Sequence, residues 1–189
     1  MDALQLLIGD HNRVRGLFAK FKEAKESENT DEMATVATKI FEDLEAHTTI
    51  EEEIFYPAIR QMDEDLVEDV EEGIQEHHVV KVLMEEMAAL EPGGDEWVAK
   101  MTVLIENVEH HAEEEEEEMF PEVRSAADAD ALEQIAVQLE ARKAEMGAPT
   151  MALAVDLTKE QLLDLAREQE IPGRSSMSQE ELAATVDAR

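Results

Sequence analysis

The stretch "HAEEEEEEMFP", residues 111–121, decides how this chain folds. A second stretch, "HTTIEEEIFYP" at residues 47–57, repeats its order of a histidine, glutamates, an apolar or aromatic pair and a proline at the same offsets. The stretches "DHNRVRGLF" at residues 10–18 and "EHHVVKVLM" at residues 76–84 form another matched pair. Because the pairs recur in the same order, the chain reads as a two-helix unit that is used twice.

Each stretch belongs to a longer segment in which apolar residues recur every three or four positions, the spacing of a helix that faces a bundle core. We expect helices over about residues 1–28, 33–57, 63–90 and 95–121. Asp2 and Gln5 suit a capping box at the start of the first helix. Pro57 is expected to end or kink the second, and Pro121 ends the fourth. The short connections predict an all-α, up-down-up-down four-helix bundle.

The rest of the chain predicts less regular additions to this bundle. A weaker helix over about residues 128–145 is expected to pack on the outside or to extend the fourth helix. We therefore assign residues 1–145 to the bundle, 146–155 to a linker and 156–189 to a small helix-loop-helix module. Two capping boxes mark the helices of that module, namely Thr158 with Gln161 and Ser178 with Glu181.

Composition excludes several classes of protein. There is no cysteine, so disulfides and thiolate metal sites are impossible. No stretch approaches the roughly 18 apolar residues of a membrane span, and the N-terminus lacks the layout of a signal peptide. We expect a cytoplasmic protein without a membrane partner. The formal net charge of −32 indicates a solvated acidic surface that attracts cations and repels nucleic acid.

Six side chains of the kinds that bind metals occupy the predicted apolar seams. One histidine on an apolar face is usually an ordinary core residue, but here every helix carries one. A buried carboxylate costs several kcal/mol unless it is paired, and the four seams contain no arginine or lysine. A metal would supply the missing positive charge. The six are His11, His47, Glu51, His77, His111 and Glu115.

The donor set indicates which metals suit the site. Imidazole and carboxylate ligands suit iron, manganese or zinc. Four histidines and two carboxylates are too many for one tetrahedral zinc ion, so we expect two metals, each with two histidines, and with Glu51 and Glu115 as bridges. Open coordination positions would accept dioxygen, peroxide or nitric oxide. The alternative is an accidental polar core without metal.

Two further histidines adjoin these candidates, His78 beside His77 and His110 beside His111. The repeat selects between them. His77 matches the register of the first-helix stretch, and His111 lies as far before its proline as His47 does. We therefore predict His77 and His111 as ligands.

The run of glutamates at residues 113–118 is mostly a solvated helix face by the same reasoning. On an α-helix only Glu115, and marginally Glu118, would point inward. The remaining glutamates would repel one another near the negative end of the helix dipole.

Residues 1–145 resemble a hemerythrin-like domain of the HHE cation-binding family, through the four stretches quoted above. The resemblance implies a four-helix bundle that holds a non-haem di-iron centre, oxo- or hydroxo-bridged, with zinc or manganese as less expected metals. It also implies that the ligands are His11, His47, Glu51, His77, His111 and Glu115.

Two positions differ from the oxygen-carrying members of that family. Lys81 stands where they have a further histidine, and the last helix pairs His111 with Glu115 rather than with an aspartate. The pattern is more similar to the branch associated with iron handling and with nitric oxide or peroxide responses. We expect a protein that binds or senses dioxygen, nitric oxide or peroxide, or that handles iron. The alternatives are an enzyme that consumes peroxide or nitric oxide in stress defence, and a cation buffer that acts through the acidic surface.

The tail resembles the small N-terminal module of the Rho transcription terminator, through "LTKEQLLDLAREQEIPGRSSMSQEEL". That resemblance implies contact with nucleic acid. Residues 150–189, however, hold four basic and eight acidic side chains, and among them only Arg174 suits a phosphate. We therefore expect a spacer or a protein-contact module, and nucleic acid is not the expected partner.

Overall fold

A computed structural model describes residues 2–149 and, further on, Lys159, Leu163, Arg167, Arg174, Met177, Ser178 and Leu182. Helices and their connections make up these residues, which contain no strand. The prediction of an all-α fold is confirmed. No helix in this described part has both the length and the apolar character of a membrane span. Of the predicted linker, residues 146–149 are described, and most of the helix-loop-helix module of residues 156–189 lies outside the described residues.

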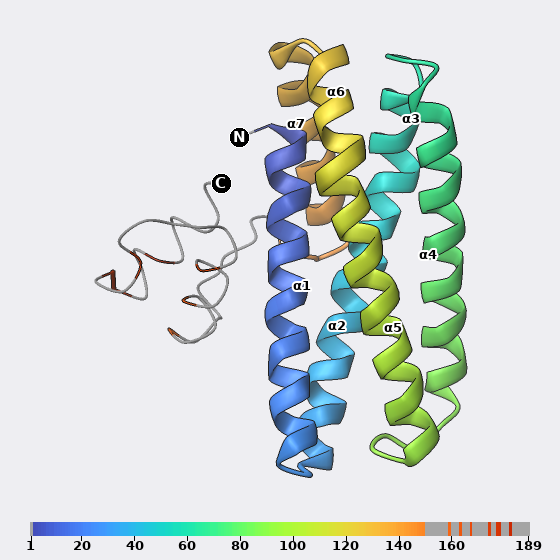
Figure 1. Cartoon of the computed structure of the whole chain (residues 1–189), viewed down its shortest axis with the longest axis vertical. Coiled ribbons are helices and arrows are strands. Elements are labelled where there is room, and N and C mark those ends of the chain that lie inside the picture. Colours follow the sequence, from blue (N-terminus) through green and yellow to red (C-terminus); the bar gives the residue numbers. More distant parts are fainter. Residues whose placement is uncertain are drawn as a thin grey trace.

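Four long helices form the bundle in up-down-up-down order (Figure 1). They are α1 (Ala3–Glu26), α2 (Thr30–Ile50), α4 (Leu66–Ala88) and α5 (Asp95–Glu114). The two halves of the sequence repeat form two helix pairs, because α1 packs against α2 and α4 packs against α5. Contacts of α1 with α5 and of α2 with α4 close the bundle. The predicted architecture is confirmed.

The first two helices begin at side-chain caps. Asp2 accepts a hydrogen bond from the backbone N–H of Gln5, and the Gln5 side chain accepts one from the backbone N–H of Asp2, both over 3.0 Å. The predicted capping box is therefore present. Asn29 caps α2 through the backbone N–H of Glu32, so this helix begins a few residues earlier than its apolar pattern suggested.

A π-helical turn follows the second helix of each two-helix unit. After α2 come η1 (Glu51–Phe55) and α3 (Tyr56–Ile59), and after α5 come η2 (Glu115–Met119) and α6 (Phe120–Ala126). The prediction that the fourth helix ends at Pro121 is wrong. Both prolines lie in the first turn of the helix that follows, where a missing backbone N–H costs little.

The core divides into two apolar clusters. One, which contains Phe55 and Phe120, fills the end of the bundle near α3 and α6. The other, which contains Phe18 and Trp97, fills the opposite end. Helix α7 (Ala129–Glu145) packs on the outside of α1, α2 and η1, one of the two placements predicted, and adds Leu139 to the first cluster. The histidines and glutamates of the predicted seams occupy the layer between the two clusters.

Candidate metal centre

The structure brings the six predicted side chains together in one buried layer. Each long helix contributes a histidine, and the two glutamates are the first residues of the two π-helical turns. A π turn breaks the regular α spacing and is frequent at functional sites. All six are buried, and they are His11, His47, Glu51, His77, His111 and Glu115.

The histidines form two pairs whose ring nitrogens converge. The Nε2 atoms of His11 and His47 lie 3.1 Å apart. The Nε2 atoms of His77 and His111 also lie 3.1 Å apart. Two nitrogens that bind one ion at about 2.1 Å, at right angles, would be about 3 Å apart. Each pair therefore has the spacing of two ligands of a single metal ion.

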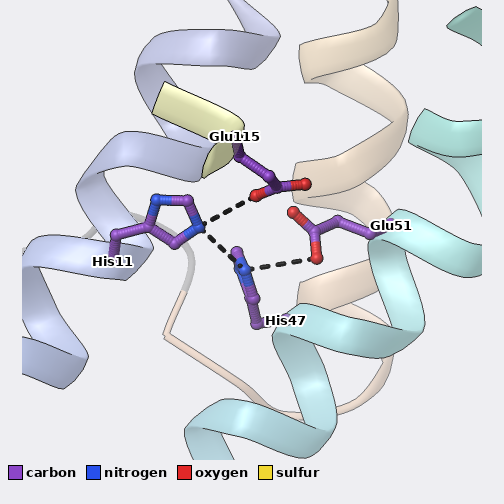
Figure 2. Close-up of side chains that lie close together, drawn as sticks. All are labelled: His11, His47, Glu51 and Glu115. Carbon is purple, nitrogen blue, oxygen red and sulfur yellow. Dashed lines mark hydrogen bonds and ion pairs between the residues drawn. The ribbon is translucent and has the colours of Figure 1, made fainter. Parts of the chain in front are cut away.

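The two carboxylates lie between the histidine pairs. Glu51 Oε2 is 3.2 Å from Nε2 of His47 and 3.3 Å from Nε2 of His77. Glu115 Oε2 is 3.2 Å from Nε2 of His11 and 3.7 Å from Nε2 of His111. Figure 2 shows the carboxylate groups of Glu51 and Glu115 facing each other beside His11 and His47. Each carboxylate thus lies between a nitrogen of one histidine pair and a nitrogen of the other.

Several buried oxygens of this layer lack the partner that burial requires. Neither oxygen of Glu51 receives a hydrogen bond, nor does Oε2 of Glu115. Their ion-pair contacts are with histidines. An unpartnered buried carboxylate costs free energy that a bound cation would recover. The residues present therefore fit a metal.

The two carboxylates have opposite pKa shifts. Burial raises the pKa of Glu51 well above its usual value, and the charge of Glu115 adds to that rise. Burial also acts to raise the pKa of Glu115, but His111 and His11 outweigh it and hold that pKa below its usual value. Without metal, therefore, Glu51 binds a proton more tightly than Glu115 does.

The histidines of the first pair also differ from each other. Burial acts to lower the pKa of His11, but its contacts with the carboxylates of Glu115 and Glu116 overcome it and raise the pKa to about 9. Burial lowers the pKa of His47 to about 4, although Asp10 opposes the change. A metal ion would have to displace the proton on His11, whereas His47 is already neutral at pH 7.

A carboxylate faces the outer ring nitrogen of every histidine. A neutral histidine whose Nδ1–H donates to a carboxylate presents the lone pair of Nε2 to the centre, which is the usual arrangement around protein-bound metals. The repeat extends to these groups, since each residue of one half has its equivalent in the other. The Nδ1 distances are 2.7 Å from His11 to Glu116, 3.0 Å from His77 to Glu52, 2.7 Å from His111 to Glu76 and 3.7 Å from His47 to Asp10.

The prediction for the glutamate run at residues 113–118 needs correction at two positions. Glu116 was placed on the solvated face, yet it contacts His11 and is only 25% exposed. Glu118, placed marginally inward, is exposed, and Met119 is buried instead. The π turn of η2 causes both differences, because it adds a residue to the turn and shifts the following side chains around the helix axis.

Basic side chains stand behind three of the four outer carboxylates. Burial of Asp10 acts to raise its pKa, but His47 and the buried Lys143 of α7 outweigh it, so the pKa is lowered. The hydrogen bond to His77, together with Lys81, lowers the pKa of Glu52 to about 2. The cationic contacts are Lys81 to Glu52 at 2.6 Å, Arg15 to Glu116 at 2.8 Å, and Lys143 to Asp10.

One aromatic pair breaks the symmetry of the repeat. Tyr56 donates its hydroxyl hydrogen to Glu115 Oε1 over 2.9 Å. Phe120, the equivalent residue of the other half, has no hydroxyl. Each ring stacks on a histidine, Tyr56 on His77 and Phe120 on His11. Burial, and then the charge of Glu115, raises the pKa of Tyr56 well above its usual value, so the phenol stays protonated.

The two neighbouring histidines lie outside the layer. His78 is exposed, and His110 is 63% exposed and contacts Glu114 at 3.2 Å. The choice of His77 and His111 from the repeat therefore agrees with burial.

An apolar pocket reaches the histidines from the side of α7. All four line it, and its walls also hold two ion pairs, Arg13 with Asp43 and Lys143 with Asp10. The apolar part of the wall comes from all four long helices, through Val14, Leu44, Val80 and Val108. Such a pocket, apolar apart from two paired charges, suits a small uncharged molecule.

Comparisons with known proteins agree with this geometry. The family model of the Hemerythrin HHE cation binding domain matches residues 2–123. A curated DNA nickase of Nostoc sp. (strain PCC 7120 / SAG 25.82 / UTEX 2576) is 28% identical over 137 residues, which cover 72% of this chain and 38% of the relative. The chain thus spans well under half of that protein's length. No solved structure matches the chain. The match to the cation-binding family ends before the tail, so the resemblance to the Rho module is not supported.

Proposed function

Because the chain belongs to the hemerythrin HHE cation-binding domain family, we propose that it holds a dinuclear non-haem iron centre that binds or senses a small ligand. The ligands of the centre are the four layer histidines and the two bridging glutamates. The observation that carries the proposal is the convergence of two Nε2 pairs, each 3.1 Å apart, on carboxylate oxygens that receive no hydrogen bond.

The donor set favours iron among the metals that such sites accept. Four imidazoles and two carboxylates, without a thiolate, suit iron or manganese, and they exceed what one tetrahedral zinc ion uses. Bound iron would supply redox chemistry and open coordination positions for dioxygen, nitric oxide or peroxide. The chain supplies geometry, since the outer carboxylates on Nδ1 orient the rings toward the centre.

Access also favours a small uncharged ligand. The apolar pocket on the α7 side leads to all four histidines, and the charges in its wall are paired, Arg13 with Asp43 and Lys143 with Asp10. Dioxygen and nitric oxide are neutral and small enough to use this path. Its apolar lining limits the entry of bulk water into the layer. The electrostatic interactions of the site are stronger for that reason.

Spectroscopic titration of the iron-loaded protein tests this proposal. Addition of nitric oxide to the diferrous protein, or of peroxide or dioxygen, is expected to change the visible spectrum at a saturable, stoichiometric ratio. Val80→Trp places a large ring in the pocket wall and is expected to slow the change. Val137→Trp, at an exposed position of α7, is the matched control. A spectrum that responds to none of these ligands would contradict the proposal.

A di-iron enzyme that consumes peroxide or nitric oxide is the second candidate. Its supporting observation is the buried Tyr56 phenol, a group able to give a proton and an electron, against the bridging Glu115. Turnover separates the two functions. Catalytic loss of peroxide or nitric oxide that falls with Tyr56→Phe while the iron content holds would favour the enzyme. A single stoichiometric reaction would favour the binding protein.

The DNA nickase relative does not lead us to propose a DNA-cutting activity. The formal net charge of −32 opposes the binding of phosphate backbones. In the described part of this chain, three basic side chains stand beside the centre, and each pairs with a carboxylate of the same chain. The pairs are Arg15 with Glu116, Lys81 with Glu52 and Lys143 with Asp10. The property that we carry over is that of the matching family, cation binding.

A further inference from the structure

The two halves of the repeat differ on their outer faces. Helix α7 packs over α1 and η1 at the level of the metal layer. The repeat relates that face to the face formed by α4 and η2, where a notch opens instead. Figure 1 shows α7 on the α1 side of the bundle, away from α4. The same two-helix unit is therefore covered in one copy and open to solvent in the other.

Residues at equivalent positions of the two faces differ in one consistent way. On the face covered by α7, four positions are apolar, and three of their side chains are buried. At the equivalent positions of the open face all four are acidic, and all four line the notch. The matched positions are Ala3 and Asp69, Leu6 and Glu72, Ile50 and Glu114, and Ile54 and Glu118.

A glycine keeps the floor of the notch open toward the centre. Gly73 is equivalent to the fully buried Leu7 of the covered face. A Cβ atom on Gly73 would lie 2.8 Å from the Tyr56 hydroxyl oxygen and 3.4 Å from Cε1 of His111. His111 itself lines the notch. A side chain such as leucine at this position would close the passage.

A buried oxygen without a hydrogen-bond partner lies at the inner end. Glu115 lines the notch and is 1% exposed, and its Oε2 receives no hydrogen bond, although Oε1 accepts one from Tyr56. Nearer the rim, Glu76, His110 and Glu114 each offer a ligand atom within 4.8 Å of the others, a spacing that could hold a metal ion. The notch therefore joins a solvent-facing group of possible ligands to the buried carboxylate of Glu115.

We propose that this notch, lined by Asp69, Glu72, Glu76, Glu114 and Glu118, is the path by which divalent cations enter the metal centre, an inference that rests on the proposed function. Its charge attracts cations, and no Lys or Arg is among the described residues that line it, whereas the charges of the apolar pocket are paired, Arg13 with Asp43 and Lys143 with Asp10. The two openings thus serve different species. Cations enter through the acidic notch, and the uncharged ligand enters through the apolar pocket.

Attraction of this kind acts on the rate of uptake rather than on the final occupancy. A cleft lined by charges of one sign raises the association rate of an oppositely charged ion by about ten- to a thousandfold, and salt reduces the effect. Loss of notch charges should therefore slow uptake while the bound state keeps its stoichiometry and its spectrum.

Stopped-flow mixing of metal-free protein with cobalt(II) tests this, with the visible absorption of the bound ion as the signal. The test variant combines Asp69→Asn, Glu72→Gln and Glu118→Gln, none of which is a ligand of the centre. The control removes the same charge at exposed positions near the other end of the bundle, through Glu26→Gln, Glu85→Gln and Glu91→Gln.

The test variant is expected to take up cobalt about tenfold more slowly than the control at low salt, with a weaker salt dependence. Its final stoichiometry and spectrum should match the wild type. Gly73→Leu, which copies the closed half, should slow uptake at every salt concentration. Equal rates in the test and control variants would overturn the proposed path and leave the metal centre standing. A wild type that binds no cobalt would overturn the metal centre itself.

Discussion

Tyr56 donates its hydroxyl hydrogen to Glu115 over 2.9 Å, and this bond distinguishes the two halves of the centre. Phe120 holds the matching position near the other half and offers no donor. Glu115 therefore has one fixed oxygen, while Glu51 has none. The carboxylates of Glu51 and Glu115, which are related by the repeat, therefore differ in their hydrogen bonds before any metal binds.

Substitutions of Tyr56 and Gly73 should have coupled effects on the free energy of unfolding. Tyr56→Phe removes a hydrogen bond to a buried carboxylate, so it should lower the free energy of unfolding of the metal-free protein by about 1–3 kcal/mol. Gly73→Ala should also destabilise, because its Cβ would lie 2.8 Å from the hydroxyl oxygen. In the Tyr56→Phe background the alanine should cost less. Urea unfolding of the four proteins measures this coupling, and strictly additive effects would argue against it.

Lys143 should anchor α7 to the bundle. Its side chain is 4% exposed and pairs with Asp10, which is 9% exposed and lies beside His47. Lys143→Met would leave a buried carboxylate without its cation, and we expect the free energy of unfolding to fall by about 3–5 kcal/mol. Lys22→Met is the matched control, because its pair with Glu109 is exposed and should contribute less than about 1 kcal/mol. Similar losses in both variants would contradict the role of Lys143.

The contribution of His11 and His47 to the stability of the metal-free protein should be greatest near pH 6.5. The pKa of His11 is raised to about 9, so its contribution is complete below pH 6.5 and is lost as the pH rises through 9. The pKa of His47 is lowered to about 4, so its contribution is present above pH 6.5 and is lost as the pH falls toward 4. Urea unfolding in the presence of a chelator checks this. His11→Gln should remove the decline above pH 6.5, and the exposed His78→Gln should not. A decline that persists in His11→Gln would show that another group causes it.

Removal of metal should lower the melting temperature. The glutamates of η2 and the two bridging carboxylates concentrate negative charge around the layer, and bound cations offset it. At a free metal concentration about a hundredfold above the dissociation constant, binding adds about 2.7 kcal/mol. For a chain of this size that corresponds to roughly 5–10 °C. Calorimetry with and without chelator measures the shift, and His47→Ala should show little of it. Equal melting temperatures with and without metal in the wild type would contradict this prediction.

The sequence was sufficient to predict the bundle and the convergence of six side chains, because both follow from apolar spacing and from the repeat. His77 and His111 could be chosen over His78 and His110 for the same reason, and burial agrees.

The groups around the layer were harder to predict, because regular α spacing does not hold there. The π turns at residues 51–55 and 115–119 rotate the chain, so Glu116 turns toward His11 and Glu118 turns to solvent. One signal was available, since Glu52 and Glu116 hold the same position in the repeat. Contacts between distant segments, such as Lys143 with Asp10, leave no periodic trace in the sequence.

The central claim is that the layer holds two iron ions on four histidines and two glutamates, and metal content with an ultraviolet–visible spectrum tests it most directly. The protein would be purified without added metal and then loaded with ferrous iron, alongside His47→Ala and the exposed-histidine control His78→Ala. We expect two irons per chain and the absorption of a bridged ferric pair in the wild type and the control, with both lost or reduced in His47→Ala. The same iron content and spectrum in all three proteins, or no iron in any of them, would contradict the claim.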